Sequence, residues 1–167
     1  IQSQNPYTEK VEKTFKSISD KEIAKKIDLA NKAFISWKEV SMKKRAVLMK
    51  NLGKVLRKNK QKYGELITRE MGKPLSQSIA EIEKCALNCD YYAENAEAFI
   101  CPEIYNSEYK HARVELEPMG VIFAVMPWNF PFWQVVRFAA PALMAGNVGV
   151  LKHASNVPQC ALAIEEA

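Results

Sequence analysis

Apolar side chains recur at helical spacing through the first hundred residues of the chain. Ser19-Asp20-Lys21-Glu22 has the form of a capping box, in which a serine and a glutamate satisfy each other's backbone amides. The apolar stripe that follows consists of Ile23, Ile27, Ala30, Phe34 and Trp37. Spacings of three and four residues predict an amphipathic helix that begins just after Ser19.

Three more helices are predicted before residue 100. Ser41 is placed to cap the second, and the apolar pattern breaks near Lys58-Asn59 before a third set of turns ends at Gly72. Pro74 fits the first turn of a long fourth helix, whose apolar stripe ends near Phe99. We therefore expect the first hundred residues to be helical.

The period changes beyond Cys101-Pro102. His111 to Glu117 alternates apolar and charged side chains, which predicts a half-exposed edge or hairpin strand. Val121 to Val125 and Val148 to Leu151 are apolar on both faces, as central strands of a parallel sheet are.

Helical segments follow both of these apolar strands. One pattern runs from Phe132 to Ala145 and stops at Gly146, and Asn156 with Pro158 has the cap-plus-first-turn form that opens another helix. The order strand, helix, strand, helix predicts an α/β fold. It consists of a helical leader followed by the start of a doubly wound, Rossmann-like parallel sheet that is incomplete.

A parallel crossover places the loops after both strands at one carboxyl edge, where open α/β sheets bind ligands. The first loop, Pro127 to Pro131, is stiffened by two prolines and carries Asn129, a neutral donor suited to an anion or oxyanion. Its alternative role is a rigid turn that packs two aromatic rings into the core. In the second loop, Lys152 either turns outward to water or contacts a phosphate or ribose, and Ser155 either closes a turn or faces the same ligand.

Composition narrows the class of protein. The chain has 167 residues, of which 48% are hydrophobic and 26% charged, an ordinary balance for a globular domain. We expect no membrane contact, because no uncharged apolar run approaches spanning length, and the start of the chain carries no secretion signal, so a cytoplasmic location is the default.

The net charge of +5 comes largely from one basic run. Its members are Lys43, Lys44, Arg45, Lys50, Lys54, Arg57, Lys58, Lys60 and Lys62. Apolar residues interleave with them at helical spacing and no aromatic platform lies beside them, so we interpret the run as a solvated helix face and expect no nucleic acid partner.

Four cysteines lack both metal-ligand spacing and the density of a disulfide scaffold. Cys85 and Cys89 stand four apart on a predicted helix, but His111 and His153 show no matching spacing. We expect free, packed thiols and no metal site.

The sequence resembles the aldehyde dehydrogenase superfamily across essentially its whole length. The matching segments are Trp37 in the leader, Glu70-Met71-Gly72-Lys73-Pro74, Glu117-Pro118-Met119-Gly120-Val121, Pro127 to Pro131, Pro141 to Asn147 and Leu151-Lys152. Within the superfamily, Tyr91-Tyr92-Ala93 and Leu151 to Asn156 look most like succinate-semialdehyde dehydrogenases.

The resemblance implies an NAD(P)-dependent oxidation in which a cysteine thiolate attacks an aldehyde and a glutamate-activated water hydrolyses the resulting thioester. Asn129 matches the oxyanion donor of the family. The residues expected to bind the cofactor are Met126, Pro127, Trp128, Lys152 and Ser155. Ser155 stands where many NAD-using members have a glutamate, whose charge would repel a 2′-phosphate, so NADP is favoured and NAD stays an alternative.

Phe130, Gln134 and Arg137 are the residues expected to bind the substrate. Arg137 interrupts an apolar segment, and its planar guanidinium suits the distal carboxylate of a semialdehyde. The competing role of Arg137 is an ion pair with an acidic residue of another helix. For Phe130, Trp133 and Gln134 the competing role is packing in the core.

In the family, the nucleophilic cysteine, the glutamate base and the glycine-containing pyrophosphate loop lie further along the chain. Cys160 follows Lys152 too soon to be that nucleophile, although a thiol near a helix amino terminus can have a lowered pKa. We therefore interpret the chain as an amino-terminal portion: residues 1–110 form the helical part of the cofactor domain, 111–118 a strand of an oligomerisation ribbon, and 119–167 the first βαβα unit.

The parent enzyme is expected to be a homo-oligomer, a dimer or tetramer. The alternative to an enzyme is a non-catalytic nucleotide-binding or regulatory module.

Overall fold

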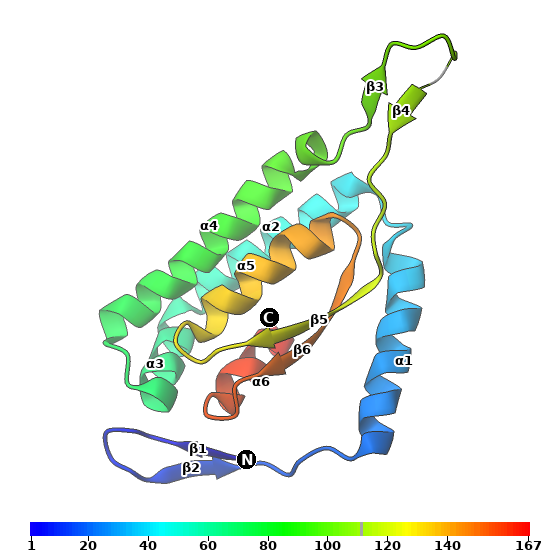
Figure 1. The fold of residues 1–167 in the computed structure, drawn as a ribbon. Coiled ribbons are helices and arrows are strands. Elements are labelled where there is room, and N and C mark those ends of the chain that lie inside the picture. The colour runs from blue at the N-terminus through cyan, green and yellow to red at the C-terminus, as the bar shows by residue number, and fades with distance from the viewer. Residues whose placement is uncertain (111) are drawn as a thin grey trace.

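The computed structural model of the chain describes residues 1–110 and 112–167, and His111 lies outside the described residues. Figure 1 shows a short hairpin, a run of helices, a second hairpin and then a strand–helix–strand–helix unit along the chain. In order they are β1 (Gln2–Gln4), β2 (Val11–Thr14), α1 (Asp20–Trp37), α2 (Met42–Lys58), α3 (Lys60–Met71), α4 (Leu75–Phe99), β3 (Glu103–Tyr105), β4 (Ala112–Val114), β5 (Val121–Met126), α5 (Pro131–Met144), β6 (Val148–His153) and α6 (Pro158–Glu166).

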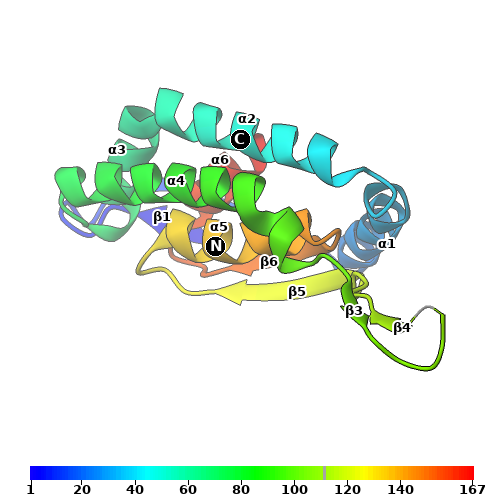
Figure 2. The same ribbon diagram turned by 90° about the horizontal axis from the view of Figure 1, so that it is seen from above.

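The core lies where α4 packs against α2, α3 and α5. Its fully buried side chains include Leu56, Ile67, Ile82, Phe132 and Met144. Seen from above, α5 lies between α4 and the strands β5 and β6 (Figure 2). The predicted α/β class is therefore confirmed, with a helical layer on one face of a short parallel sheet.

Strands β5 and β6 pair in parallel, with Val121 opposite Val148 and Met126 opposite His153. The predicted crossover is confirmed, because α5 connects two parallel neighbours. On β5, Ala124 is 5% exposed, whereas Phe123 and Val125 are 66% and 61% exposed. One face of this sheet is thus covered and the other is open.

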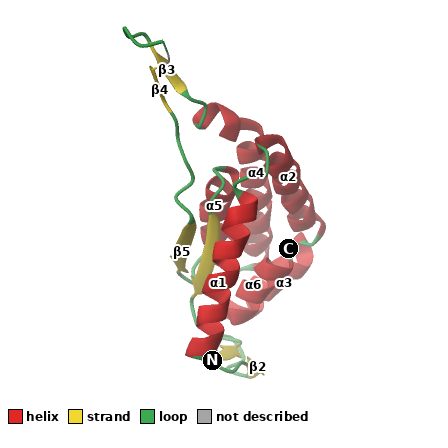
Figure 3. Cartoon of the chain, turned by 90° about the vertical axis from the view of Figure 1, so that its right-hand side faces the viewer, coloured by secondary structure: helices red, strands yellow, loops and turns green. Residues whose placement is uncertain are grey.

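The strand expected at residues 111–117 is shorter than predicted. Ala112 to Val114 form β4, which pairs antiparallel with β3, and His111 lies outside the described residues. The hairpin projects away from the body of the molecule (Figures 1 and 3). A hairpin strand is confirmed, but β3 also corrects the expectation that residues 1–110 hold helices alone.

The start of the chain is another correction to that expectation. Strands β1 and β2 form an antiparallel hairpin, in which the Asn5 side chain accepts from the backbone N–H of Tyr7 at 2.9 Å. These strands are short and β2 is exposed throughout, so no alternation of apolar and polar residues marks them. Their turn chemistry, rather than their hydrophobic pattern, determines the fold here.

Most helices begin and end where the sequence predicts. Ser19 and Glu22 make both bonds of the capping box, a new helix begins after Asn59, and Gly72 closes α3 with a φ of 76°. Two capping predictions are wrong. The Ser41 side chain makes no capping bond to α2, and the residue before α6 is Val157 rather than Asn156.

Smaller differences affect the prolines. Pro74 precedes α4 instead of lying in its first turn, and α5 begins at Pro131 and continues through Pro141. In the part of the chain that the structure describes, every helix is too short or too polar to cross a membrane.

Candidate active site

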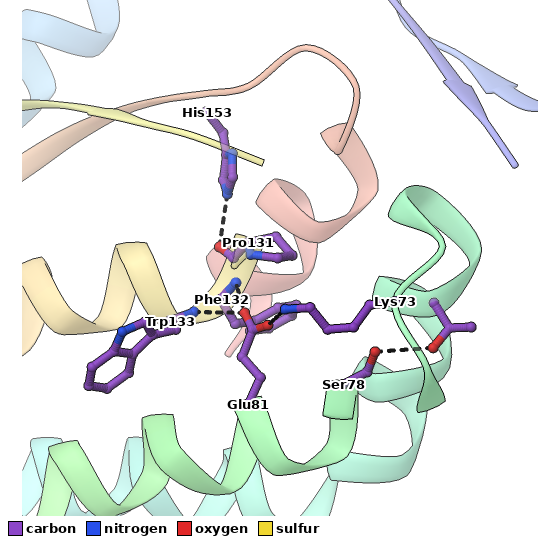
Figure 4. Close-up of polar contacts among 8 residues, drawn as sticks. Lys73, Ser78, Glu81, Pro131, Phe132, Trp133 and His153 are labelled. Carbon is purple, nitrogen blue, oxygen red and sulfur yellow. Dashed lines mark hydrogen bonds and ion pairs between the residues drawn. The ribbon is translucent and has the colours of Figure 1, made fainter. Parts of the chain in front are cut away.

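The two loops predicted to meet do lie at one edge of the β5–β6 sheet. Val125 is opposite Lys152 in the parallel register, so both strands end together and deliver Pro127–Phe130 and Ala154–Val157 to the same side. A hydrogen bond joins the loops directly: the Nε2 atom of His153 lies 2.9 Å from the carbonyl oxygen of Pro131 (Figure 4).

His153 makes contacts that specify its protonation. The Pro131 oxygen can only accept, so Nε2 carries the proton, and Nδ1 accepts from the backbone N–H of Ala154 at 2.8 Å. Both contacts together fit the neutral imidazole with its proton on Nε2. His153 therefore acts as a crosslink between the two loops, a role the sequence did not suggest.

The turn after β5 is open to solvent. Trp128 and Phe130 are 49% and 44% exposed, and Pro127 and Asn129 are exposed as well. No hydrogen bond joins the Asn129 carboxamide to another of the described residues. Packing of the two rings into the core, the alternative for this turn, is not what the structure has.

The residues that follow the turn are held by a buried carboxylate. Glu81 of α4 is 4% exposed, and its Oε1 accepts from the backbone N–H groups of Phe132 at 2.9 Å and Trp133 at 3.0 Å. Its other oxygen pairs with Lys73, which is 8% exposed. Figure 4 shows the pair of Lys73 with Glu81. The Lys73 Nζ also lies 3.8 Å from the centre of the Phe130 ring, so one ammonium contacts both the carboxylate and the turn.

A second buried carboxylate does the same for the helix after β6. Glu70 of α3 is 3% exposed and accepts from the backbone N–H groups of Gln159 at 2.9 Å and Cys160 at 2.8 Å. The Ser3 hydroxyl donates to the same carboxylate at 2.6 Å. The β1–β2 hairpin is thereby tied to the start of α6.

These two carboxylates decide where an anion can bind. The first amides of a helix at the carboxyl edge of a sheet often bind phosphate. At α5 and α6 those amides are already bonded to Glu81 and Glu70, so the phosphates of a nucleotide would have to bind elsewhere. Lys152, which the structure places within β6 and not in the loop after it, and Ser155 are both exposed and remain available for the ribose side.

The three predicted substrate residues lie on or beside α5. Phe130 precedes the helix, Gln134 is half-buried, and Arg137 is exposed. No carboxylate of the described residues forms an ion pair with Arg137. The ion-pair alternative for Arg137 therefore finds no partner here. Among the predicted cofactor residues, Met126 is half-buried at the end of β5.

The thiols are free and mostly interior. Cys85, Cys89 and Cys160 are buried and Cys101 is exposed. Burial raises the pKa of Cys89 to about 12 and that of Cys85 further. Burial and then the neighbouring Glu70 carboxylate raise the pKa of Cys160, which corrects the idea that the helix amino terminus lowers it. Among the described residues, no three His, Cys, Asp or Glu side chains are grouped to hold a metal ion.

Sequence reasoning missed Glu70, Lys73, Glu81 and His153 as parts of this region. Glu70 and Lys73 stood in a recognised segment, but nothing in that segment says what they contact. Glu81 carried a signal, because it falls at helical spacing between Ser78 and Cys85 on the buried stripe of α4. A carboxylate on such a stripe requires buried donors, and the donors proved to be amides of a different helix.

Comparisons with known proteins identify the family of this chain. The sequence model described as "Aldehyde dehydrogenase family" matches residues 1–167. A probable NADP(+) succinate-semialdehyde dehydrogenase of Synechocystis sp. is 49% identical over 162 residues, which cover 97% of this chain and 36% of the relative. An NADP(+) succinate-semialdehyde dehydrogenase of Mycobacterium bovis is 47% identical over 161 residues, covering 95% and 35%.

The fold comparison gives the same answer. A crystal structure of succinic semialdehyde dehydrogenase from Streptococcus pyogenes, in complex with NADP+, superposes with a TM-score of 0.94 at 34% identity, covering 99% of this chain and 36% of that one. The chain thus spans about a third of the length of the relatives it matches. Since the family match extends from the first residue to the last, the chain belongs to the aldehyde dehydrogenase family.

Proposed function

We propose that the chain is the amino-terminal part of an enzyme that oxidises succinate semialdehyde to succinate with NADP+. The observation that carries the proposal is the shared edge of β5 and β6. There the Asn129 carboxamide and the Lys152 ammonium are exposed, and α5, the helix that starts at this edge, carries the exposed Arg137 guanidinium; neither cation has an ion-pair partner among the described residues. Relatives named for this substrate and cofactor support the choice.

Asn129 is the proposed oxyanion donor. When a cysteine thiolate adds to the aldehyde carbon, the carbonyl oxygen gains negative charge, and a preorganised amide N–H stabilises that charge by roughly 3 kcal/mol. A free carboxamide on a proline-flanked turn suits this role, because neither donor is used within the described residues. The turn is also anchored directly after Asn129, by Lys73 at Phe130 and by His153 at Pro131.

Lys152 and Ser155 are the proposed contacts to the adenosine ribose and its 2′-phosphate. Lys152 is exposed near the end of β6, opposite Val125. An ammonium attracts a phosphate, and a serine in place of a carboxylate removes the repulsion that would disfavour it. When bound, the nicotinamide of the cofactor supplies the hydride acceptor of the reaction; Met126, Pro127 and Trp128 are proposed to contact the cofactor from the β5 side.

Arg137 is the residue proposed to bind the substrate carboxylate. It lies on α5, the helix that follows the Asn129 turn, on the same side as Gln134 at helical spacing, and Phe130 and Gln134 would complete the pocket. A guanidinium can hold a carboxylate through two parallel hydrogen bonds, which fixes orientation as well as charge.

The nucleophile and the base are proposed to come from outside these residues. The buried thiols of Cys85, Cys89 and Cys160 have raised pKa values, so little thiolate forms at neutral pH. The exposed Cys101 follows α4 beside the β3–β4 hairpin, at the far end of α4 from the α3–α4 turn that holds Lys73 (Figure 1).

We also propose a homo-oligomer, with the β3–β4 hairpin as its contact. Ile104 is 84% exposed, and Tyr105 and Val114 are 52% and 51% exposed, on strands whose outer edges are unpaired among the described residues. Such edges can be extended by a strand of a second copy. Sedimentation of the enzyme should show a dimer or tetramer, and a monomer would contradict this part of the proposal.

The substrate assignment is tested with the enzyme that carries this chain. We expect Arg137→Gln to lower kcat/KM for succinate semialdehyde by about 10- to 100-fold, the value of a lost charge-assisted pair, followed as NADPH absorbance. Butanal has the same chain length and no carboxylate, so its kcat/KM should not change.

Arg69→Gln is the matched control, because Arg69 is exposed on α3 and forms no ion pair among the described residues. It should leave both aldehydes unaffected. Absence of NADP-linked turnover in the unaltered enzyme, or equal losses for both aldehydes in Arg137→Gln, would overturn the assignment.

A further inference from the structure

The helices that follow the two crevice loops have no caps of their own. The residues before α5 and α6 are Phe130 and Val157, neither of which makes a side-chain capping bond, and each helix begins with a proline. Proline lacks an N–H, so the next amides are the first that need a partner. In both helices a distant glutamate supplies it.

The two glutamates are equivalent in most respects. Glu81 binds the amides of Phe132 and Trp133, and Glu70 binds those of Gln159 and Cys160, all at 2.8 to 3.0 Å. Both carboxylates are at least 96% buried. Each comes from a helix on the other side of the core, so each loop is fixed from outside its own strand–helix unit.

Their remaining contacts differ. Glu81 is paired with the Lys73 ammonium, which also lies against Phe130 of the turn. Glu70 is satisfied by the Ser3 hydroxyl, which in turn accepts from the Gln159 side chain at 2.9 Å. Glu81 thus forms an ion pair, whereas among the described residues Glu70 accepts hydrogen bonds from neutral donors only.

We propose that Glu81 and Glu70 are separate positioning residues for the two halves of the crevice. Glu81, with Lys73, sets the Asn129 turn, and Glu70, with Ser3, sets the loop that carries Ser155 and follows Lys152 of β6. Neither glutamate touches the reacting atoms; each acts through the helix start that it holds. The inference rests on the proposed function, because it assigns oxyanion chemistry to one loop and nucleotide binding to the other.

The physical reason is the short distance along the chain between each cap and its loop. Asn129 stands three residues before Phe132, and Ser155 stands four before Gln159. Loss of a cap frays the first turn of a helix and shifts the residues that enter it. A shift of about 1 Å at a transition-state donor can cost about 100-fold in rate, whereas a shift at a ribose contact weakens binding instead.

Twin substitutions in the enzyme test this separation. In Glu81→Gln the amide oxygen can still accept from α5, but its NH2 group faces the Lys73 ammonium, donor against donor. We expect kcat for the aldehyde to fall by about 10- to 100-fold with the KM for NADP+ within about 2-fold. Glu70→Gln should raise the KM for NADP+ by about 10-fold with kcat within about 2-fold.

Rescue distinguishes positioning from a general loss of structure. Adding Lys73→Met to Glu81→Gln removes the unpaired ammonium and leaves a neutral cap, although it also removes the contact of Lys73 with Phe130, so kcat should recover in part, to within about 5-fold of the unaltered enzyme. Glu83→Gln is the charge control on the same helix, because Glu83 pairs with Lys60 and Arg57 away from the crevice, and it should change neither constant. Parallel losses in both twin variants, or no loss in either, would overturn the proposal.

A second readout decides the question if the enzyme proves to oxidise no aldehyde, an outcome that by itself defeats only the proposed function. The side-chain carboxamide resonances of Asn129, followed by NMR, should move in Glu81→Gln and stay in place in Glu70→Gln. Movement in both variants, or in neither, would show that Glu81 does not set the turn.

Discussion

At the scale of single residues, some buried charged groups of this chain have hydrogen-bond partners and one, in the part that the structure describes, lacks a partner for part of its side chain. Glu70 and Glu81 are nearly fully buried and have all the donors that they need. Arg45 is 8% exposed, and its Nε has no hydrogen-bond partner among the described residues. Burial lowers the pKa of Arg45, because the charged form loses hydration without gaining a counter-ion.

Arg45 should therefore destabilise the chain. We expect Arg45→Met, which keeps the length of the side chain and removes the charge, to raise the free energy of unfolding by about 1–3 kcal/mol. Urea titration followed by circular dichroism measures the change. Lys54→Met on the exposed face of the same helix serves as control and should have little effect. A loss of stability in Arg45→Met would mean that the guanidinium is paired in solution.

At the scale of elements, helix starts show how far local sequence controls this fold. At α1 both capping partners are close in sequence, and the capping box predicted from Ser19 and Glu22 is present, with the Glu22 carboxylate 2.7 Å from the Ser19 amide. At α5 and α6 the capping carboxylates come from far along the chain, and no local pattern could have indicated them. Asn156 was a reasonable candidate cap, but Glu70 already binds those amides.

The two serines that precede α1 and α2 give a matched pair. Ser19→Ala removes a capping hydrogen bond and should lower the free energy of unfolding by about 1 kcal/mol. Ser41→Ala removes no such bond, because the Ser41 side chain makes none to α2, and should cost only a few tenths of a kcal/mol. Thermal or urea unfolding of both variants measures the difference. Equal costs would show that the Ser41 cap forms in solution.

At the scale of the whole molecule, the helices, the parallel crossover and the shared loop edge were predictable because hydrophobic period and connection rules specify them. The β1–β2 hairpin was not, since strands this short depend on a turn and on the docking of Ser3 at Glu70. The candidate site was predictable where its residues end or follow strands, as Lys152 and Asn129 do. Its supporting residues were not, because their partners lie on other elements.

Because of the buried thiols, the free energy of unfolding of the whole chain depends on pH in the alkaline range. Cys85, Cys89 and Cys160 have raised pKa values when folded, whereas an unfolded thiol titrates near about 8.5. Below that pH both states are protonated and the stabilising contribution is complete. Above it only the unfolded state loses protons, so stability falls as pH rises.

We expect the free energy of unfolding to fall by about 2 kcal/mol for each buried thiol between pH 7 and pH 10, as measured by urea titration. Cys101→Ser should leave this slope unchanged, because Cys101 is exposed, whereas Cys89→Ala should reduce it. A flat profile would mean that the interior thiols ionise in the folded chain.

The hydrogen bond between Ser3 and Gln159 also has a consequence for the order in which the molecule assembles. It joins residues 156 positions apart, so the Glu70 contact set cannot close until almost the whole of this chain has been synthesised. The Glu81 contacts need nothing beyond Trp133. During synthesis the half of the crevice that holds Asn129 can therefore form first, whereas the amino-terminal hairpin, whose Ser3 can bond to Glu70 of α3, completes its contacts only when α6 is present.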